Sequence, residues 1–117
     1  MNVLITGISG FLGFNLVHSF NKITEVKIFG LSSTLKGNNY QFVEKIYSYE
    51  ELDDFNQFDV VIHLAGIAHD IGGNYNDSDY DRVNVNLTKQ IFEKFVNSSA
   101  TKFIFLSSSK VYGDNIK

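Results

Sequence analysis

The chain has 117 residues, of which 44% are hydrophobic and 20% charged, and it carries a formal net charge of −3 at pH 7. A chain of this size can bury a core, so we expect one folded domain over residues 1–117, not a disordered chain or a basic nucleic-acid-binding arm. The absence of cysteine excludes disulfides and thiolate chemistry. The sequence contains no run of about 18 apolar residues, so it predicts no membrane-spanning helix. Met1 leads directly into strand-like residues with no basic segment or cleavage site, so we expect a cytoplasmic protein.

The first half of the sequence predicts three strands and one helix. Residues 3–6 (VLIT) form a short β-rich run that ends at a glycine. Apolar side chains then recur at helical spacing, which indicates a helix that begins inside the glycine segment. Residues 26–31 are a second candidate for a buried strand, and residues 41–46 are a weaker third one. The expected apolar face of the helix carries Leu12, Leu16, Val17 and Phe20.

The rest of the sequence, residues 47–117, predicts two further strands and two helices. Residues 49–55 have the pattern of a short helical stretch. Residues 59–65 (DVVIHLA) are the clearest strand, because they are continuously apolar and β-branched, as in a strand covered on both faces. Residues 79–98 predict a long helix with Ser78 as its N-cap, and residues 102–107 predict the last strand. Strands that alternate with helices in this way indicate βαβ units and a parallel sheet.

The turn between the first strand and the first helix is rich in glycine. Residues 6–13 read TGISGFLG. A dinucleotide site needs one glycine for a tight turn, one for backbone approach to the pyrophosphate and one for close helix–strand packing, and Gly7, Gly10 and Gly13 can take these parts in that order. The helix N-terminus would add free N–H groups for the phosphates. No Gly-Lys-Ser/Thr triplet closes the segment, which excludes a P-loop.

The end of the second predicted strand bears on the choice of cofactor. NAD sites usually place a carboxylate there to accept hydrogen bonds from the ribose hydroxyls, and this chain has none at that point. Ser32, Ser33 and Lys36 could hold a 2′-phosphate, which would favour NADP. An ordinary polar loop after a strand explains the same residues equally well. The sequence therefore predicts NAD or NADP.

Four segments, in order along the chain, resemble the extended short-chain dehydrogenase/reductases of the NAD-dependent epimerase/dehydratase group. Residues 6–13 resemble the family's glycine-rich opening, and residues 61–66 (VIHLAG) its fourth strand, which passes beside the cofactor. Residues 84–88 (NVNLT) are similar to its Asn-Val-x-Gly-Thr helix, with Leu87 in place of the glycine. Residues 103–113 (FIFLSSSKVYG) are similar to its fifth strand and active-site serine loop. Within the family, the His-Leu-Ala and Ser-Ser-x-Lys-Val motifs look most like those of nucleotide-sugar epimerases and reductases of surface-polysaccharide pathways.

The resemblance implies a fold and a set of site residues. The fold would be α/β, a Rossmann-like doubly wound parallel sheet of about five strands in order 3-2-1-4-5. Ser108 would be the catalytic serine, which hydrogen-bonds the reacting hydroxyl of a nucleotide-sugar substrate, and Asn84 would lie buried below the active site. The implied cofactor-binding residues are Gly7, Gly10, Phe11, Leu12 and Gly13 at the pyrophosphate, and Leu64, Ala65 and Gly66 at the nicotinamide ribose.

The catalytic Tyr-x-x-x-Lys pair of the family is missing. Its tyrosinate is the general base, and its lysine supports that base and holds the ribose. No tyrosine of this chain is followed by a lysine four positions later. We therefore expect the amino-terminal part of a longer enzyme, without the family's carboxy-terminal substrate region, that binds cofactor but does not turn over. The positions in question hold Glu44, Glu51, Asp53, Asp79, Asn84 and Ile116.

Two other readings of the chain stay open. It could be a complete NAD(P)-binding sensor or regulatory module, or its missing half could come from another chain, including a second copy in a homodimer. Residues 103–106 (FIFL) favour the truncated enzyme over the stand-alone module, because a self-sufficient protein would normally cover or charge such an apolar edge strand.

Metal and nucleic-acid sites are not expected. The spaced carboxylates Asp77, Asp79 and Asp81 imitate the start of a calcium loop, but Arg82 stands where that loop needs glycine. The three histidines show no paired metal-ligand spacing. Basic residues are scattered and outnumbered by acidic ones, so nucleic acid is not an expected partner.

Overall fold

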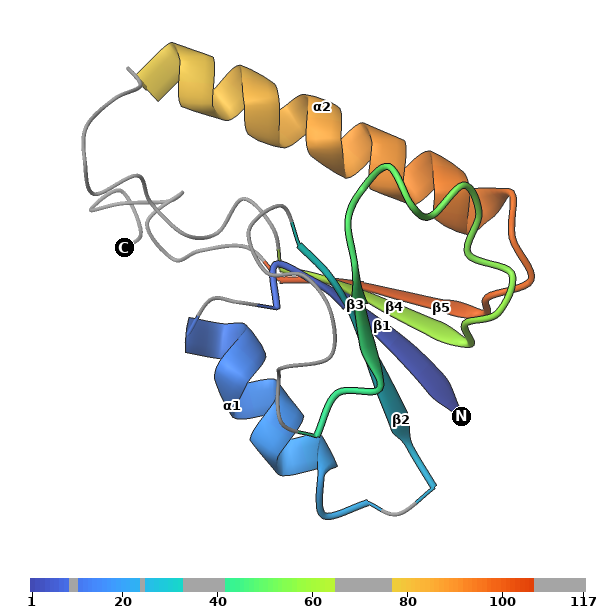
Figure 1. The fold of residues 1–117 in the computed structure, drawn as a ribbon. Coiled ribbons are helices and arrows are strands. Elements are labelled where there is room, and N and C mark those ends of the chain that lie inside the picture. The colour runs from blue at the N-terminus through green and yellow to red at the C-terminus, as the bar shows by residue number, and fades with distance from the viewer. Residues whose placement is uncertain (9–10, 24, 33–41, 65–76, 107–117) are drawn as a thin grey trace, which may run out of the picture.

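The computed structural model describes residues 1–8, 11–23, 25–32, 42–64 and 77–106. They form five strands and two helices, arranged as Figure 1 shows. In chain order the elements are β1 (Asn2–Thr6), α1 (Phe11–Phe20), β2 (Lys27–Leu31), β3 (Lys45–Tyr47), β4 (Val60–His63), α2 (Asp77–Val96) and β5 (Lys102–Phe105).

The strands form one parallel sheet in the order β3-β2-β1-β4-β5, which confirms the expected order. From β1 the chain builds outward through β2 and β3 to one edge, and then returns to add β4 and β5 on the other side of β1. The strand order thus reverses between β1 and β4. In doubly wound sheets, ligands bind in the crevice outside the carboxyl ends of the strands at such a reversal. Thr6 and His63, the last residues of β1 and β4, lie side by side there.

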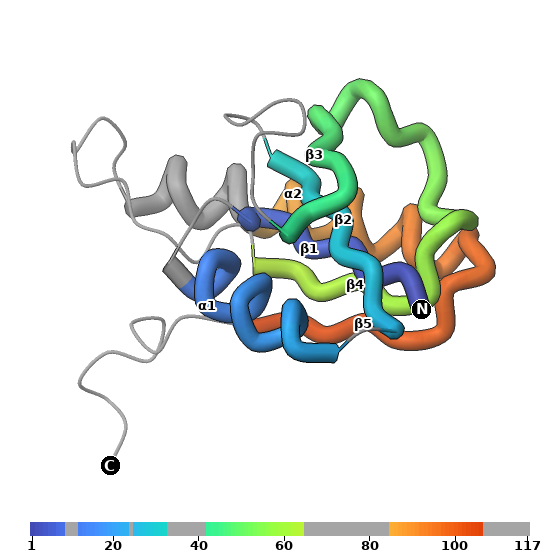
Figure 2. Tube along the Cα trace, turned by 60° about the horizontal axis from the view of Figure 1, so that its bottom comes forward, coloured from blue at the N-terminus to red at the C-terminus, as the bar shows by residue number. Residues whose placement is uncertain are grey.

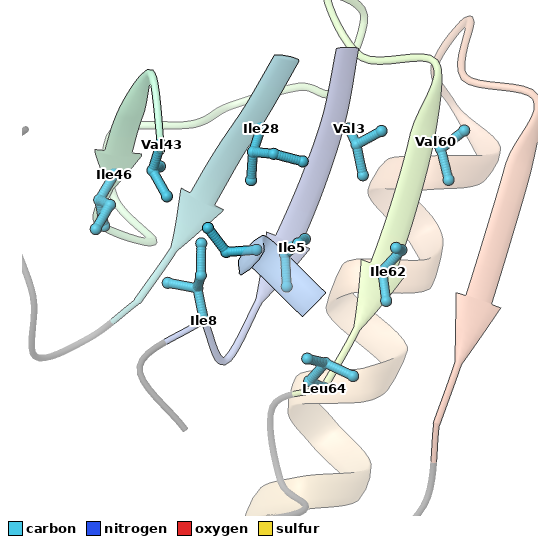
Figure 3. Packing of buried hydrophobic residues seen from close by; sticks show 10 residues of the cluster. Val3, Ile5, Ile8, Ile28, Val43, Ile46, Val60, Ile62 and Leu64 are labelled. Carbon is cyan, nitrogen blue, oxygen red and sulfur yellow. The ribbon is translucent and has the colours of Figure 1, made fainter. Parts of the chain in front are cut away.

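The two helices cover opposite faces of the sheet (Figure 1, Figure 2). Successive strand residues point to opposite faces, so β1 contributes Val3 and Ile5 to the cluster under α1 and Leu4 to the cluster under α2. Val17 of α1 completes the first cluster, whose strand residues are drawn in Figure 3, and Ile91 of α2 completes the second. Because both faces are covered, the central strands β1 and β4 are mostly apolar, as the sequence predicted, with Thr6 and His63 as polar residues at their carboxyl ends.

The third strand differs from the prediction. It comprises Lys45–Tyr47, and is therefore shorter and later than the predicted residues 41–46. Phe42 has φ 70°, a left-handed backbone conformation that a strand cannot contain. The extended segment consequently begins only after this residue.

The short helix predicted at residues 49–55 is wrong. The chain forms an isolated turn in which the Glu51 N–H donates to the Ser48 carbonyl at 3.2 Å, and the Ser48 N–H donates to Glu51 Oε1 at 2.7 Å. Further along, Asp54 Oδ1 accepts the Asn56 N–H at 2.9 Å. The Asn56 N–H, which a helix over residues 49–55 would direct to the Leu52 carbonyl, is thus taken by a side-chain oxygen.

Two further predictions about the helices need correction. α2 begins at Asp77, so Ser78 lies within its first turn instead of capping it. α1 begins inside the glycine segment as predicted and buries Val17, but Leu12 is 41% exposed and does not join the apolar face expected for it. Neither helix of the described chain is long and apolar enough to cross a membrane.

Candidate functional site

The turn after β1 has the backbone geometry that a tight glycine turn requires. Gly7 has φ 68°, in the left-handed region that is costly for residues with a Cβ. Its N–H donates to the carbonyl of Leu31 at 3.1 Å, which ties the turn to the end of β2. α1 starts at Phe11, so its N-terminus lies close in sequence to the carboxyl end of β1. This is the arrangement that presents free helix N–H groups to an anion at the strand reversal.

Gly13 is the glycine of close packing. An alanine Cβ at this position would lie 2.4 Å from the carbonyl oxygen of Ile8 and 2.7 Å from its Cα. The first turn of α1 therefore packs directly against the backbone that leaves β1. The Ile8 side chain is fully buried, and it comes within 2.9 Å of the Cβ position of Gly30 in β2. The glycine turn is thus held to the sheet by contacts that leave no room for larger residues.

Substitution of Gly7 by alanine is expected to lower the free energy of unfolding by about 1–2 kcal/mol, because the left-handed conformation brings Cβ close to the following carbonyl. Gly7→Asn is the matched control, since asparagine adopts this conformation more readily, and it should lose less. Urea unfolding followed by circular dichroism measures both. Equal stability of Gly7→Ala and the wild type would contradict the positive φ.

The end of β2 carries a buried serine. Ser32 is 3% exposed, and its N–H donates to the Tyr47 carbonyl at 3.0 Å. It stands directly after β2, at the place where an NAD site usually has a carboxylate. Ser33 and Lys36, the other residues considered for the ribose phosphate, lie outside the described residues.

A histidine at the end of β4 is held between two threonines. Thr6 Oγ1 lies 2.6 Å from His63 Nδ1, and Thr88 Oγ1 of α2 lies 2.9 Å from His63 Nε2. The imidazole is fully buried and stacks on the ring of Phe105 at a centroid distance of 5.4 Å. The Leu64 N–H donates to both the carbonyl and the Oγ1 of Thr6, each at 3.1 Å. These contacts join β1, β4 and α2 at the carboxyl edge of the sheet.

Burial lowers the pKa of His63 from its ordinary value of 6.5 to about 4, because the charged imidazolium would lose its hydration. The ring is therefore neutral at pH 7. Among the described side chains its neighbours are two hydroxyls and aromatic rings, which hydrogen-bond and pack but bring no negative charge. Sequence reasoning placed this histidine in the strand that resembles the family's fourth strand and did not expect it to bind a metal, but assigned it no role of its own. A lone polar residue inside an otherwise continuous apolar strand was the signal available for it.

Several of the predicted site residues that the structure describes lie together at the carboxyl ends of the strands. Gly7, Gly13, Ser32 and Leu64 all lie at or next to the carboxyl ends of β1, β2 and β4. Leu64 is buried and its N–H is already bonded to Thr6. Within the described residues, no group of three or more histidine and carboxylate side chains could hold a metal ion. Leu12 lies in the first turn of α1 and is exposed. The other predicted site residues, Gly10, Ser33, Ala65, Gly66 and Ser108, lie outside the described residues, as do the side chains of Phe11 and Asn84.

A family model described as the NAD dependent epimerase/dehydratase family matches residues 3–117. Among curated proteins, the chain is 29% identical to an uncharacterized protein of Methanocaldococcus jannaschii, over 99% of this chain and 42% of that protein. It is also 29% identical to a dTDP-D-glucose 4,6-dehydratase of Dictyostelium discoideum, over 97% of this chain and 30% of that protein. The chain therefore spans less than half the length of these relatives.

Solved structures share the fold. A UDP-glucuronic acid 4-epimerase from Bacillus cereus in complex with NAD superposes with a TM-score of 0.70 at 23% identity, over 97% of this chain and 42% of that one. A UDP-N-acetylglucosamine 4-epimerase from the same organism gives a TM-score of 0.72 at 21% identity, over 100% of this chain and 40% of that one. The Rossmann-like sheet and the resemblance drawn from the sequence motifs are both confirmed.

Proposed function

The chain belongs to the NAD dependent epimerase/dehydratase family, and we propose that it forms the NAD-binding region of a nucleotide-sugar epimerase or dehydratase. The observation that carries the proposal is the glycine turn at the strand reversal, where Gly7 has a positive φ and Gly13 lies against the Ile8 backbone. Bound NAD would supply the acceptor for a hydride removed from a sugar carbon. The residues of this chain would bind and orient it.

Within this proposal each part of the turn has a separate task. Gly7 lets the chain leave β1 and turn back toward α1. Gly10 is expected to allow the pyrophosphate to approach the backbone, beside the N–H groups at the start of α1. Gly13 keeps α1 close enough to the sheet for those groups to reach the phosphates. Leu64, Ala65 and Gly66 would bound the nicotinamide ribose on the other side of the reversal.

We propose further that these 117 residues bind the cofactor without turnover. The Tyr-x-x-x-Lys pair that supplies the general base in the family is absent from the sequence. Ser108 would act on the sugar hydroxyl only together with that pair. A nucleotide-sugar substrate, a cytoplasmic location and a single domain over residues 1–117 belong to the same proposal.

The β5 edge supports the longer enzyme over a stand-alone sensor. Ile104, Phe105 and Leu106 are 42%, 51% and 37% exposed, and β5 pairs only with β4 among the described strands. An apolar edge of this kind usually has a neighbour. Further sheet from the rest of the enzyme, or a second copy in a homodimer, would cover it.

Titration of NAD and NADP into the purified chain tests the cofactor assignment, with native mass spectrometry as the readout. We expect one dinucleotide per chain, and NAD to bind more tightly than NADP. Gly10→Val should abolish the adduct, because the side chain would occupy the space of the pyrophosphate. Ser19→Ala, an exposed position near the other end of α1, is the control and should bind as the wild type does.

Two results would contradict the proposal. One is a folded Gly10→Val chain that binds NAD as tightly as the wild type, which would refute the glycine assignment. The other is a folded wild-type chain that binds neither dinucleotide. Epimerisation or dehydration of a nucleotide sugar by the 117-residue chain would refute the separate claim that it does not turn over.

A further inference from the structure

The buried polar side chains of the described residues are concentrated at one edge of the sheet. They are Thr6, Ser32 and His63, which end β1, directly follow β2 and end β4 respectively. Elsewhere the described core is apolar. Burying a polar group is unfavourable unless it is hydrogen-bonded, and an apolar residue could fill the same space without that cost. Polar groups buried at the carboxyl edge of the sheet, two of them where the strand order reverses, therefore suggest a role beyond packing.

Thr6, His63 and Thr88 form a continuous chain of hydrogen bonds that ends on a backbone group. It runs from Thr88 Oγ1 on α2 to His63 Nε2 at 2.9 Å, and from His63 Nδ1 to Thr6 Oγ1 at 2.6 Å. Thr6 Oγ1 in turn accepts the Leu64 N–H at 3.1 Å. Leu64 directly precedes Ala65 and Gly66, the residues assigned to the nicotinamide side of the cofactor. A side chain of α2 is thus connected to the point where the chain enters that segment.

The short separation of Thr6 Oγ1 and His63 Nδ1 favours one direction of these bonds. Because Thr6 Oγ1 accepts the Leu64 N–H, its own proton can point to His63 Nδ1, whose short 2.6 Å separation suits an O–H donor. A neutral imidazole with an unprotonated Nδ1 carries its proton on Nε2. That Nε2–H can then donate to Thr88 Oγ1. Both ring nitrogens of His63 are hydrogen-bonded in this arrangement.

We propose that His63 is a positioning residue of the cofactor site, held as the Nε2–H tautomer between Thr6 and Thr88 so that the Leu64 backbone is fixed at the strand reversal. The link to the cofactor rests on the proposed function. The restraint that these hydrogen bonds place on the Leu64 backbone does not depend on the proposed function. Loss of the Thr88 hydroxyl should free the imidazole to rotate, loosen Thr6 and weaken the bond to the Leu64 N–H.

Thr88→Val is the variant that separates positioning from packing, because valine keeps the branched shape and removes only the hydroxyl. We expect the NAD dissociation constant of the folded variant to rise about tenfold, and amide hydrogen exchange at Leu64 to quicken by a similar factor. Thr88→Ser restores a hydroxyl and should recover both values. Thr101→Val is the matched control, since it loses a threonine hydroxyl bond to the Asp59 carbonyl at the opposite edge of the sheet. It should change neither value.

The nitrogen chemical shifts of the His63 ring, measured by NMR without cofactor, give an independent readout. A proton on Nε2, together with faster Leu64 exchange in Thr88→Val, supports the positioning role even if the wild type binds no NAD, in which case only the proposed function fails. A proton on Nδ1 would overturn the proposal. It would also be overturned if Thr88→Val were less stable but kept wild-type NAD affinity and Leu64 exchange, because the chain would then serve packing alone.

Discussion

Replacement of Gly13 by alanine is expected to lower the free energy of unfolding by about 3 kcal/mol, at the upper end for overpacking. The new Cβ would lie 2.4 Å from the Ile8 carbonyl oxygen and 2.7 Å from the carbonyl carbon. These are backbone atoms of the turn that leaves β1, so α1 must move away from the sheet as a unit. Urea unfolding of the 117-residue chain, followed by circular dichroism, measures the loss.

Gly30→Ala is the comparison that isolates the backbone contact. The three atoms nearest to its Cβ would be side-chain atoms, at 2.9 and 3.0 Å from Ile8 and 3.2 Å from Ile46, so rotation of these side chains can relieve part of the overlap. We expect a smaller loss of about 1 kcal/mol. Helix propensity acts in the opposite direction at Gly13, because alanine is favoured over glycine in a helix by about 1 kcal/mol. A Gly13→Ala chain more stable than the wild type would therefore contradict the contact.

The sheet and the glycine turn were predictable because their signals are local. Continuous apolar runs such as residues 59–65 have few alternatives to a strand covered on both faces. Glycines at fixed spacing after a strand impose the turn and the close approach of the helix, and Gly13 against Ile8 is the approach expected of the third glycine. The order of the strands followed from the family resemblance carried by these same segments.

The segment between β3 and β4 was mispredicted because its contacts are long-range. Leu52 and Phe55 are spaced as on a helix, and both are buried. They belong to the cluster under α2. Lys94 Nζ of α2 donates to the Leu52 carbonyl at 2.6 Å, and the Ser99 hydroxyl donates to the Asn56 carbonyl at 2.9 Å. Partners far along the chain therefore satisfy this backbone in a non-helical form, and local spacing contains no information about them.

The hydrogen-bonded chain of Thr6, His63 and Thr88 could not be predicted for the same reason, because its contacts are long-range. The partners of His63 are 57 residues earlier, at Thr6, and 25 residues later, at Thr88. Each of the three falls inside a segment that resembles the family, yet each has an ordinary local explanation as part of a strand or helix. Only the pairing of β1 with β4, and the position of α2 over them, brings the three side chains together.

The stability of the chain is expected to fall as the pH drops from about 6.5 toward 4, because His63 binds a proton more readily when the chain is unfolded. The pKa of its ring is lowered to about 4 in the fold and returns to 6.5 in the unfolded state. Between these values the unfolded chain binds more protons, so acid favours unfolding there, and the contribution levels off below the folded pKa. The whole shift corresponds to about 3 kcal/mol, of which about 2 kcal/mol is lost between pH 7 and pH 5.

Urea unfolding at these two pH values tests the prediction on the wild type and two variants. His63→Gln removes the buried titrating group, and so should lose about 2 kcal/mol less than the wild type over this interval, although it is less stable at both pH values. His18→Gln, which removes an exposed imidazole at the surface of α1, is the matched histidine control. Carboxylates also titrate in this range, but they are common to all three chains and cancel in the comparison. An equal loss of unfolding free energy in His63→Gln and the wild type would mean that protonation of the buried imidazole does not cause the loss of stability in acid.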